Sequence, residues 1–312
     1  MSFEQINILA KQRKPFLFIS DFKGKNVAVF LLEELQKEDI EFCIDENYSY
    51  RAHQHRLQKT PIDFFAYKKK FDAVIEKIKS GETYILNLTQ PTPIKTQLSL
   101  KEMFQVTNAH YKLRYKDQFL CFSPEKFIQI HNNTIHTFPM KGTIDASVIN
   151  AKEKILADEK ERAEHIMIVD LLRNDLSMVA LHVKVERFRY LQSIEAGEKK
   201  LLQVSSHISG TLHDNWQDNL GTILQTLLPA GSISGAPKKS TLAIIEDVEK
   251  YERGYFSGVF GVFDGESLDS GVMIRFIEKS ADGYIYKSGG GITLDSDAKR
   301  EYEELQDKIY LP

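Results

Sequence analysis

The sequence contains only two cysteines, Cys43 and Cys121, and a single tryptophan. Apolar residues flank both cysteines, and the pair is spaced too widely for the knuckles that hold structural metals. Strand cysteines in such surroundings are usually inert packing residues. We therefore expect two reduced core residues without a catalytic role.

Long apolar runs and an excess of one charge are also absent. No stretch approaches the roughly 20 apolar residues of a membrane span, and the first residues lack the basic and apolar regions of a signal peptide. We expect a cytoplasmic protein. Because 41 Lys and Arg residues nearly balance 44 Asp and Glu residues, the net charge is −3, and no global field attracts nucleic acid or an anionic membrane. Local groups must hold any anionic ligand.

The pattern of apolar residues predicts an α+β protein with antiparallel sheets. Strands are expected at residues 15–22, 26–30, 84–89, 119–122, 126–130, 258–263, 271–277 and 283–287, with a turn at 131–133. Helices are expected at residues 64–79, 150–174, 236–251 and 297–309. With 42% hydrophobic residues the chain can bury a large core, and no repeat or long Pro/Gly linker interrupts it. One compact unit is expected.

Two glycine-bearing stretches resemble phosphate-binding loops, but neither has the complete motif. Residues 231–238 have the outline of a Walker loop, yet Ala236-Pro237 interrupts the Gly-Lys that such a loop needs. The run Gly289-Gly290-Gly291 lacks the dinucleotide-binding spacing. Each stretch is either a simple turn or a place where bare backbone amides approach a carboxylate closely.

Four carboxylates form two matched pairs, Glu161 with Glu164 and Glu301 with Glu304, each three residues apart in a predicted helix. Residues at this spacing share one helical face. A solvated face would explain such pairs. A Mg²⁺ ion would also explain them, since it takes one or two carboxylates and completes its shell with water and substrate oxygens. Lys308, one turn beyond Glu304, could contact the same substrate.

Several motifs occur in a fixed order along the chain. They are GETYILNLTQ at 81–90, SPEKF at 123–127, PMKGT at 139–143, AEH at 163–165, VD at 169–170, RND at 173–175, PAGSISGAPK at 229–238, GGGI at 289–292, DS at 295–296 and EYEE at 301–304. Together they resemble the chorismate-utilising family, which comprises component I of anthranilate synthase and of aminodeoxychorismate synthase, isochorismate synthase and salicylate synthase.

The resemblance covers about residues 60–312 and implies the anthranilate synthase component I fold. In that fold, large antiparallel sheets pack in a sandwich with helices on the outside. The implied organisation is a single chorismate-binding domain, 1–312, of which 1–59 is a shortened N-terminal part. No counterpart of the tryptophan-binding motif of anthranilate synthases is found there.

Two positions distinguish among the family's reactions. Lys141 lies in Pro-x-Lys-Gly-Thr, as in members similar to aminodeoxychorismate synthase, where anthranilate and salicylate synthases carry alanine. Ile85 lies where isochorismate and salicylate synthases are expected to hold a general-base lysine, and an alkyl group cannot take a proton. The resemblance therefore implies a transferase that aminates chorismate at C4 for 4-aminobenzoate and folate biosynthesis.

The resemblance also implies how the substrate is held. Mg²⁺ on Glu164 and Glu304, with Glu161 and Glu301 beside them, would bind the ring carboxylate, helped by the amides of Gly142 and Thr143. Arg275 would bind the enolpyruvyl carboxylate. Further substrate contacts are implied at Gly235, Gly290, Gly291, Lys308 and Phe256, and the last of these stands where many relatives have tyrosine.

The implied chemistry uses Lys141 as the nucleophile at C2 and Glu125 as the general acid for the C4 hydroxyl. His207 would orient or polarise the ring. Lys141 could instead be a solvated turn residue, and Arg275 and Lys308 surface charges.

Neither cysteine lies in the glycine-flanked turn that a glutaminase nucleophile needs. A separate glutamine amidotransferase subunit is therefore the implied source of ammonia. Two alternatives remain open, namely anthranilate synthase component I and a catalytically silent chorismate-binding subunit.

Overall fold

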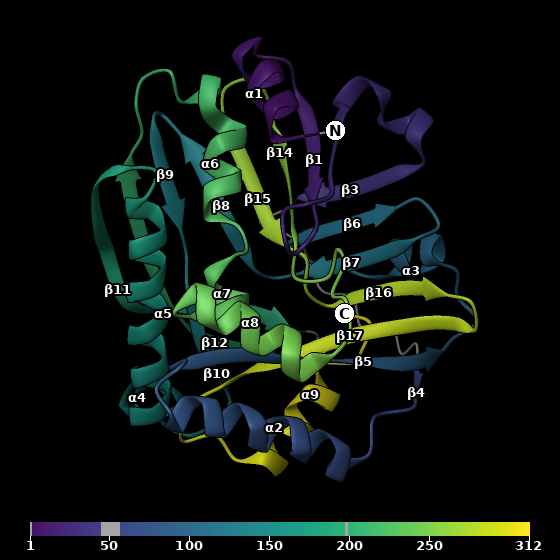
Figure 1. Ribbon diagram of the computed structural model, residues 1–312, viewed down its shortest axis with the longest axis vertical. Coiled ribbons are helices and arrows are strands. Elements are labelled where there is room, and N and C mark those ends of the chain that lie inside the picture. The colour runs from purple at the N-terminus through teal and green to yellow at the C-terminus, as the bar shows by residue number, and fades with distance from the viewer. Residues whose placement is uncertain (1, 45–56, 197–198) are drawn as a thin grey trace. The chain divides into compact units, whose positions relative to one another are not determined.

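The computed structural model describes residues 2–44, 57–196 and 199–312 (Figure 1). Contacts divide the chain into two compact units. The first contains Met1–Leu35, Glu125–Ser232 and Ser257–Val272, and the second Gln36–Pro124, Ile233–Phe256 and Met273–Pro312. Each unit is assembled from three separate segments, so no single stretch of the sequence marks a boundary between them.

The first unit is built on an antiparallel sheet, which contains nine strands within the described residues. The strands follow the order β10-β12-β9-β8-β15-β14-β1-β2, with β11 paired to β12. Their bounds are β1 Phe16–Ser20, β2 Val27–Leu31, β8 Lys126–His131, β9 Thr134–Thr137, β10 Met140–Asp145, β11 Leu181–Ala196, β12 Lys199–Thr211, β14 Val259–Phe263 and β15 Leu268–Val272. All five residues of β1 are buried, in keeping with its place between β2 and β14.

The turn predicted at residues 131–133 is confirmed between β8 and β9. Asn132 and Asn133 have φ values of 49° and 55°, and two successive left-handed residues are the signature of the hairpin turn whose twist matches its strands. Asparagine tolerates this conformation better than most residues.

Helices of the first unit are α1 Phe3–Lys11, α4 Ala151–Ala157, α5 Glu159–Ser177, η2 Trp216–Asn219 and α6 Leu220–Leu227. The single helix predicted at 150–174 is in fact α4 followed by α5. The break falls at Asp158, whose extended backbone ends α4 and whose carboxylate accepts a 2.9 Å hydrogen bond from the Glu161 amide to cap α5. The apolar periodicity did not reveal this break, because it continues across both helices.

The second unit is built on another antiparallel sheet, with eight strands in the described ranges. Their order is β13-β5-β17-β16-β7-β6-β3, with β4 paired to β5. The strand bounds are β3 Ile40–Ile44, β4 Gln58–Lys59, β5 Ile85–Lys95, β6 Tyr111–Tyr115, β7 Phe119–Ser123, β13 Gly235–Ala236, β16 Phe276–Ser280 and β17 Gly283–Ile292. The two sheets with helices confirm the predicted α+β class with antiparallel sheets.

The helices of this unit are α2 Phe64–Lys79, α3 Leu100–Val106, α8 Lys238–Glu249 and α9 Ala298–Asp307, and two short helices, η1 Leu32–Glu38 and α7 Gly231–Ser234, lie where the chain passes between units. Helix α2 has the predicted limits. The side chain of Asp63 caps it by accepting from the amides of Phe65 and Ala66.

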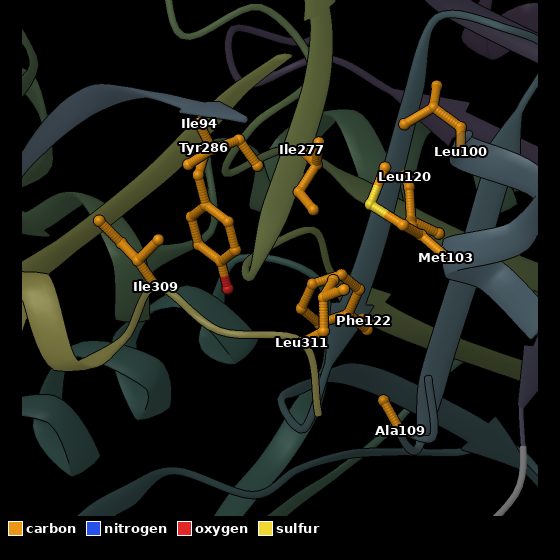
Figure 2. Packing of buried hydrophobic residues seen from close by; sticks show 10 residues of the cluster. All are labelled: Ile94, Leu100, Met103, Ala109, Leu120, Phe122, Ile277, Tyr286, Ile309 and Leu311. Carbon is orange, nitrogen blue, oxygen red and sulfur yellow. The ribbon is translucent and has the colours of Figure 1, made fainter. Parts of the chain in front are cut away.

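One core cluster of the second unit joins its sheet to α3 and to the C-terminal residues (Figure 2). Its buried members are Ile94, Leu100, Met103, Ala109, Leu120, Phe122, Ile277, Tyr286, Ile309 and Leu311. Figure 2 shows the Tyr286 ring reaching between Ile94 and Ile309, and its hydroxyl donates to the Tyr310 carbonyl at 3.2 Å. This bond satisfies a polar group that burial would otherwise leave unpaired.

The strand predicted at 271–277 is wrong. Strand β15 ends at Val272 in the first sheet, and β16 begins at Phe276 in the second. The apolar run is continuous because both strand ends are buried, so the passage from one sheet to the other leaves no polar mark in the sequence.

Neither glycine-rich stretch is a simple turn. Gly289, Gly290 and Gly291 lie within β17, opposite Thr89, Leu88 and Asn87 of β5. Residues 231–236 form α7 and then β13. None of the helices in the described part of the chain is long and apolar enough to cross a membrane.

Both cysteines lie in strands and are free. Cys121 in β7 is fully buried, and burial raises the pKa of its thiol. Cys43 in β3 is partly buried. The expectation of packing residues is confirmed for Cys121.

A methyl group at Gly221 should destabilise the first unit. Where α6 meets α1, a Cβ atom at Gly221 would lie 1.8 Å from the Phe3 carbonyl oxygen. We expect Gly221→Ala to lower the free energy of unfolding by about 1–3 kcal/mol, the usual cost of overpacking. Urea unfolding measures the change. Thr226→Ala, at an exposed position of the same helix, should cost less than half as much, and equal costs would contradict the proposed clash.

Candidate functional site

The predicted site residues fall into two sets, one in each unit. Those of the first unit are Glu125, Lys141, Gly142, Thr143, Glu161, Glu164 and His207. Those of the second unit are Gly235, Phe256, Arg275, Gly290, Gly291, Glu301, Glu304 and Lys308.

In the first unit, a bulged strand faces the carboxylates of α5. The register of β10 against β12 shifts between Met140 and Thr143, and Gly142 within the bulge has a φ of +81°. A bulge redirects the side chains of its strand. Here it turns Lys141 toward α5, where the Lys141 Nζ lies 2.5 Å from Glu164 Oε2. Lys141 is thus a paired strand residue and not a solvated turn residue.

The side chain of Glu164 is only 5% exposed, whereas that of Lys141 is 26% exposed. A second lysine, Lys160, approaches the other Glu164 oxygen at 3.9 Å from the same helix. An ion pair with one buried member is far less screened by water than a surface pair. The solvated-face interpretation of Glu164 is therefore wrong.

Glu161 shares the face of α5 with Glu164 and also lies against the bulge. A Cβ atom at Gly142 would be 3.3 Å from Glu161 Oε2. That oxygen is buried and has no hydrogen-bond partner among the described residues. Burial raises the pKa of the Glu161 carboxyl, and Lys141 opposes that shift. A buried carboxylate oxygen without a partner is costly unless a cation or donor joins it.

Glu125 lies between β7 and β8, and its carboxylate accepts a very short hydrogen bond from the Ser232 hydroxyl. Its carbonyl accepts from the Val272 amide at 3.0 Å, which fixes its backbone beside β15.

His207 lies on the other face of β12 from Lys141. The neighbouring Ser206 Oγ is 2.7 Å from the His165 Nε2 on α5, and successive strand residues point to opposite faces. The His207 Nε2 is 2.9 Å from the His136 Nδ1, and its ring stacks on Phe138. Burial lowers the pKa of His207, and that of His136 to about 4, so both rings are neutral at neutral pH. The structure does not bring His207 together with the α5 carboxylates.

In the second unit, the acidic pair of α9 faces a bare strand. A Cβ atom at Gly290 would lie 3.4 Å from Glu301 Oε2, 3.7 Å from Lys308 Nζ and 3.9 Å from Glu304 Oε1. Lys308 Nζ is 2.7 Å from Glu304 Oε1 and donates to the Gly289 carbonyl at 2.9 Å. Gly290 thus leaves room beside two carboxylates and an ammonium group, as a small charged ligand requires.

The glycine preceding Gly290 has a different reason to be glycine. A Cβ atom at Gly289 would lie 2.5 Å from Thr89 Cγ2 and 2.6 Å from the Leu88 carbonyl oxygen. Gly235 is equally constrained, with a φ of +135° and only 2.0 Å between such a Cβ and the Ile85 carbonyl oxygen. Close approach to β5 therefore explains both glycines without a ligand.

Arg275 lies in the connection between β15 and β16, with a φ of +52° that is uncommon for a residue with a side chain. Its guanidinium group lies over the Tyr310 ring, 4.7 Å from the centroid. Phe256 is 2% exposed and packs against Phe276. Ile85 is 3% exposed in β5, where it offers no base.

A buried ion pair, which the sequence did not indicate, supports this part of the second unit. Arg253 binds both oxygens of Glu249, at 2.6 and 2.9 Å, and also donates to the Asn87 carbonyl at 2.7 Å. Glu249 accepts from the amide and hydroxyl of Thr89. Since Asn87 and Thr89 pair with Gly291 and Gly289, the ion pair fixes the strand against which the glycine run lies.

Gln203 is another residue of this region that the sequence analysis did not identify. It pairs with Thr143 across β10 and β12, and its buried Oε1 has no partner among the described residues. A lone glutamine in a strand carries no sequence signal.

Within the described part of the chain, no three His, Cys, Asp or Glu side chains converge as a metal-binding group. Two acidic side chains lie on α5 and two on α9, and among the described residues Glu161 Oε2 on α5 is a buried acceptor without a hydrogen-bond partner. That supply suits magnesium, which needs only one or two carboxylates.

Comparison with known families gives a match over residues 24–311 to the chorismate binding enzymes. The chain belongs to this family. A "PabA-like protein" of Haemophilus influenzae is 49% identical, covering 99% of this chain and 95% of its own length. Aminodeoxychorismate synthase component 1 of Bacillus subtilis is 32% identical over 77% of this chain. The match covers 54% of that relative, so the chain spans about half its length.

Solved structures share the fold. The menaquinone-specific isochorismate synthase of Escherichia coli superposes with a TM-score of 0.67 at 16% identity, covering 99% of this chain and 90% of its own. Anthranilate synthase component I of Streptococcus pneumoniae has a TM-score of 0.68 at 25% identity, covering 81% and 58%. The expected anthranilate synthase component I-like fold is therefore confirmed.

The two adjacent glycines of β17 should respond differently to the same change. Gly289→Ala should lower the unfolding temperature strongly, because its methyl group clashes with Thr89 and Leu88. Gly290→Ala should unfold near the parental temperature but bind chorismate at least about 10-fold more weakly, since its methyl group occupies the space beside Glu301. Calorimetric titration and thermal unfolding measure both effects. Parental chorismate affinity in Gly290→Ala would show that this space is not used.

Proposed function

We propose that the chain aminates chorismate at C4 with ammonia, giving 4-amino-4-deoxychorismate, and that a separate glutaminase subunit supplies the ammonia. The observation that carries the proposal is the placement of Lys141 on a bulge, in contact with the buried carboxylate of Glu164 on α5. The relative named aminodeoxychorismate synthase component 1 supports the same reaction.

In the proposed reaction, the ion pair between Lys141 and Glu164 opens, the Lys141 ammonium group loses one proton to solvent, and the neutral amine attacks C2 of the ring. Both ring double bonds shift and the C4–O bond breaks. Glu125 gives a proton to the departing hydroxyl, which leaves as water. Ammonia then attacks C4, both double bonds shift back, the bond between C2 and Lys141 breaks to release the neutral amine, and the new nitrogen loses a proton.

We propose that Mg²⁺ is held mainly by Glu164 and Glu304, with Glu161 and Glu301 beside them. When bound, it would neutralise the ring carboxylate of chorismate. The Glu161 oxygen that has no partner among the described residues supports the α5 ligands, and the space beside Gly290 supports those of α9. The amides of Gly142, Thr143, Gly290 and Gly291 and the cations Arg275 and Lys308 would orient the two carboxylates of the substrate.

The contact between Lys141 and Glu164 gives this ligand set a further consequence. Glu164 contacts the Lys141 ammonium group. A carboxylate engaged by a metal is a poorer partner for an ammonium group. Glu164 would therefore serve both as the partner of Lys141 and as a metal ligand.

Anthranilate synthesis is the second candidate, favoured by the shared fold with anthranilate synthase component I. Lys141 distinguishes the two functions, because direct amination at C2 needs no lysine there. Product identification by mass and by chromatography separates 4-amino-4-deoxychorismate from anthranilate.

Withholding ammonia should trap the lysine on its substrate. Incubated with chorismate and Mg²⁺ alone, the protein should gain the mass of chorismate less one water, and peptide mass spectrometry should place the adduct on Lys141. Lys141→Ala should abolish the adduct and slow amination at least about 10²-fold. The matched control is Lys160→Ala, which removes the other lysine beside Glu164 and should keep the adduct. A Lys141→Ala variant as fast as the parent would refute the mechanism.

Removing one charge from the acidic pairs should weaken metal binding. Glu164→Gln and Glu304→Gln should each raise the Mg²⁺ concentration needed for half-maximal activity by about 10-fold or more, because each removes a hard anionic ligand. The control is Glu303→Gln, which removes an exposed carboxylate of α9 that is not among the proposed ligands. It should leave the Mg²⁺ concentration for half-maximal activity unchanged. Unchanged magnesium dependence in both site variants would overturn the ligand assignment.

Glutamine alone should not support turnover. Cys121 is fully buried and Cys43 lies within a strand, so the chain offers no exposed thiol at a turn for glutamine hydrolysis. The purified chain should be active with ammonium salts at mildly alkaline pH and become glutamine-dependent only with an added glutaminase subunit. Glutamine-dependent product from the rigorously purified chain would contradict the need for a partner.

A further inference from the structure

The Glu125 carboxylate is held asymmetrically. Ser232, in the first turn of α7, donates its hydroxyl to Glu125 Oε1. The hydrogen bond is very short, and the Glu125 backbone is fixed independently by its bond from Val272. Ser232 therefore selects one of two chemically equivalent oxygens.

A small cavity adjoins this pair within the first unit. Its volume is about 20 Å³, and both Glu125 and Ser232 line it. A cavity of this size holds one water molecule when enough polar groups surround it. Thr137 and the buried Asp175 also line the cavity, while Phe127, Phe138, Leu172, Leu176, Leu227 and Ala230 contribute apolar walls.

We infer that Ser232 is a positioning residue for proton delivery by Glu125, and that the adjoining cavity receives the water that leaves C4. This inference rests on the proposed function, in which Glu125 is the general acid. Ser232 contributes no proton to the substrate.

The asymmetry determines which oxygen carries the proton. With Ser232 donating to Oε1, the proton of the neutral acid resides on Oε2, which then gives it to the departing hydroxyl. The C4–O bond breaks, one water forms, and Glu125 becomes a carboxylate. The Ser232 hydrogen bond is stronger to this carboxylate than to the neutral acid. It therefore favours the proton transfer where the charge develops.

The cavity gives the released water a place beside its donor. Glu125, Ser232, Thr137 and Asp175 provide polar partners, and the apolar walls limit exchange with other water. Lys126 and Asp175 are the other titratable groups that line the cavity. Beside these charged groups, Ser232 is a neutral hydroxyl that donates to Glu125.

The test is the steady-state kinetics of Ser232→Ala in the complete chain with saturating ammonium and Mg²⁺. We expect kcat to fall about 10- to 100-fold, the range for losing one hydrogen bond to a charged group, with the KM for chorismate within about 2-fold of the parent. Activity needs Glu125 protonated, and losing a donor disfavours its ionised form. The high-pH limb of the kcat profile should therefore move to higher pH. Ser232→Thr, which keeps the hydroxyl, should restore both kcat and the limb.

The control is Ser177→Ala, which removes a serine hydroxyl of the first unit that bonds to the Arg173 carbonyl and should leave kcat and the profile unchanged. Thermal unfolding confirms that each variant is folded. A folded Ser232→Ala with parental kcat and an unmoved limb would overturn the inference. So would a Ser232→Thr variant that is folded but as slow as Ser232→Ala.

Glu125→Gln separates this inference from the proposed function. If Glu125→Gln is inactive while Ser232→Ala behaves as the parent, the proposed function stands and the role of Ser232 is wrong. If Glu125→Gln retains parental activity, Glu125 is not the acid, and the proposed mechanism fails together with the inference built on it.

Discussion

The pairing of β10 with β12, interrupted by one bulge, is the constraint on which the first unit's chemistry depends. Without the shift between Met140 and Thr143, strand alternation would place Lys141 and Gly142 on opposite faces. With it, both approach α5, so that one face of the helix presents Glu164 to Lys141 and Glu161 to Gly142. Gly142 adopts the left-handed backbone conformation of the bulge at little energetic cost, because glycine has no Cβ atom.

The second unit also places acidic side chains beside a strand, but it does so without a bulge. Its glycine run keeps β17 regular but bare, and the neighbouring strand β5 is held by the buried pair of Glu249 and Arg253. Breaking such a pair leaves an uncompensated buried charge. The buried ion pair therefore holds the backbone of β5 beside β17. On β17, Gly290 lies next to two carboxylates and a lysine.

The sequence predicted the fold class, the limits of α2 and most of the strands, because apolar periodicity and capping residues act locally. The common spacing in α5 and α9 singled out the two acidic pairs but fitted a solvated face as well, and their assignment as metal ligands is what the family resemblance implies. It could not show the strand switch between Val272 and Phe276 or the break at Asp158, since burial continues through both. The long hairpin of β11 and β12 was missed as well, because most described positions of β11 are exposed or half-buried and form no clear apolar run.

The site residues also differ in whether the sequence could identify them. Motif order identified Lys141 and the four carboxylates, whereas Ser232, Gln203, Glu249 and Arg253 act through contacts with residues distant in the sequence. Gly289 and Gly290 look identical in sequence, yet one is required by its neighbouring strand and the other leaves space for a ligand. Only the register of β17 on β5 distinguishes them.

The pairing of β1 with β14 affects how the chain is made. Phe16 pairs with Phe263, so this fully buried strand emerges from the ribosome long before one of its two partners has been synthesised. The glycine run of β17 likewise pairs with β5 only after all the strands between them in the sequence have been synthesised. Non-local strand pairing of this kind slows folding and leaves apolar strand edges exposed. The nascent chain should therefore depend on chaperones until β14 and β17 have been synthesised.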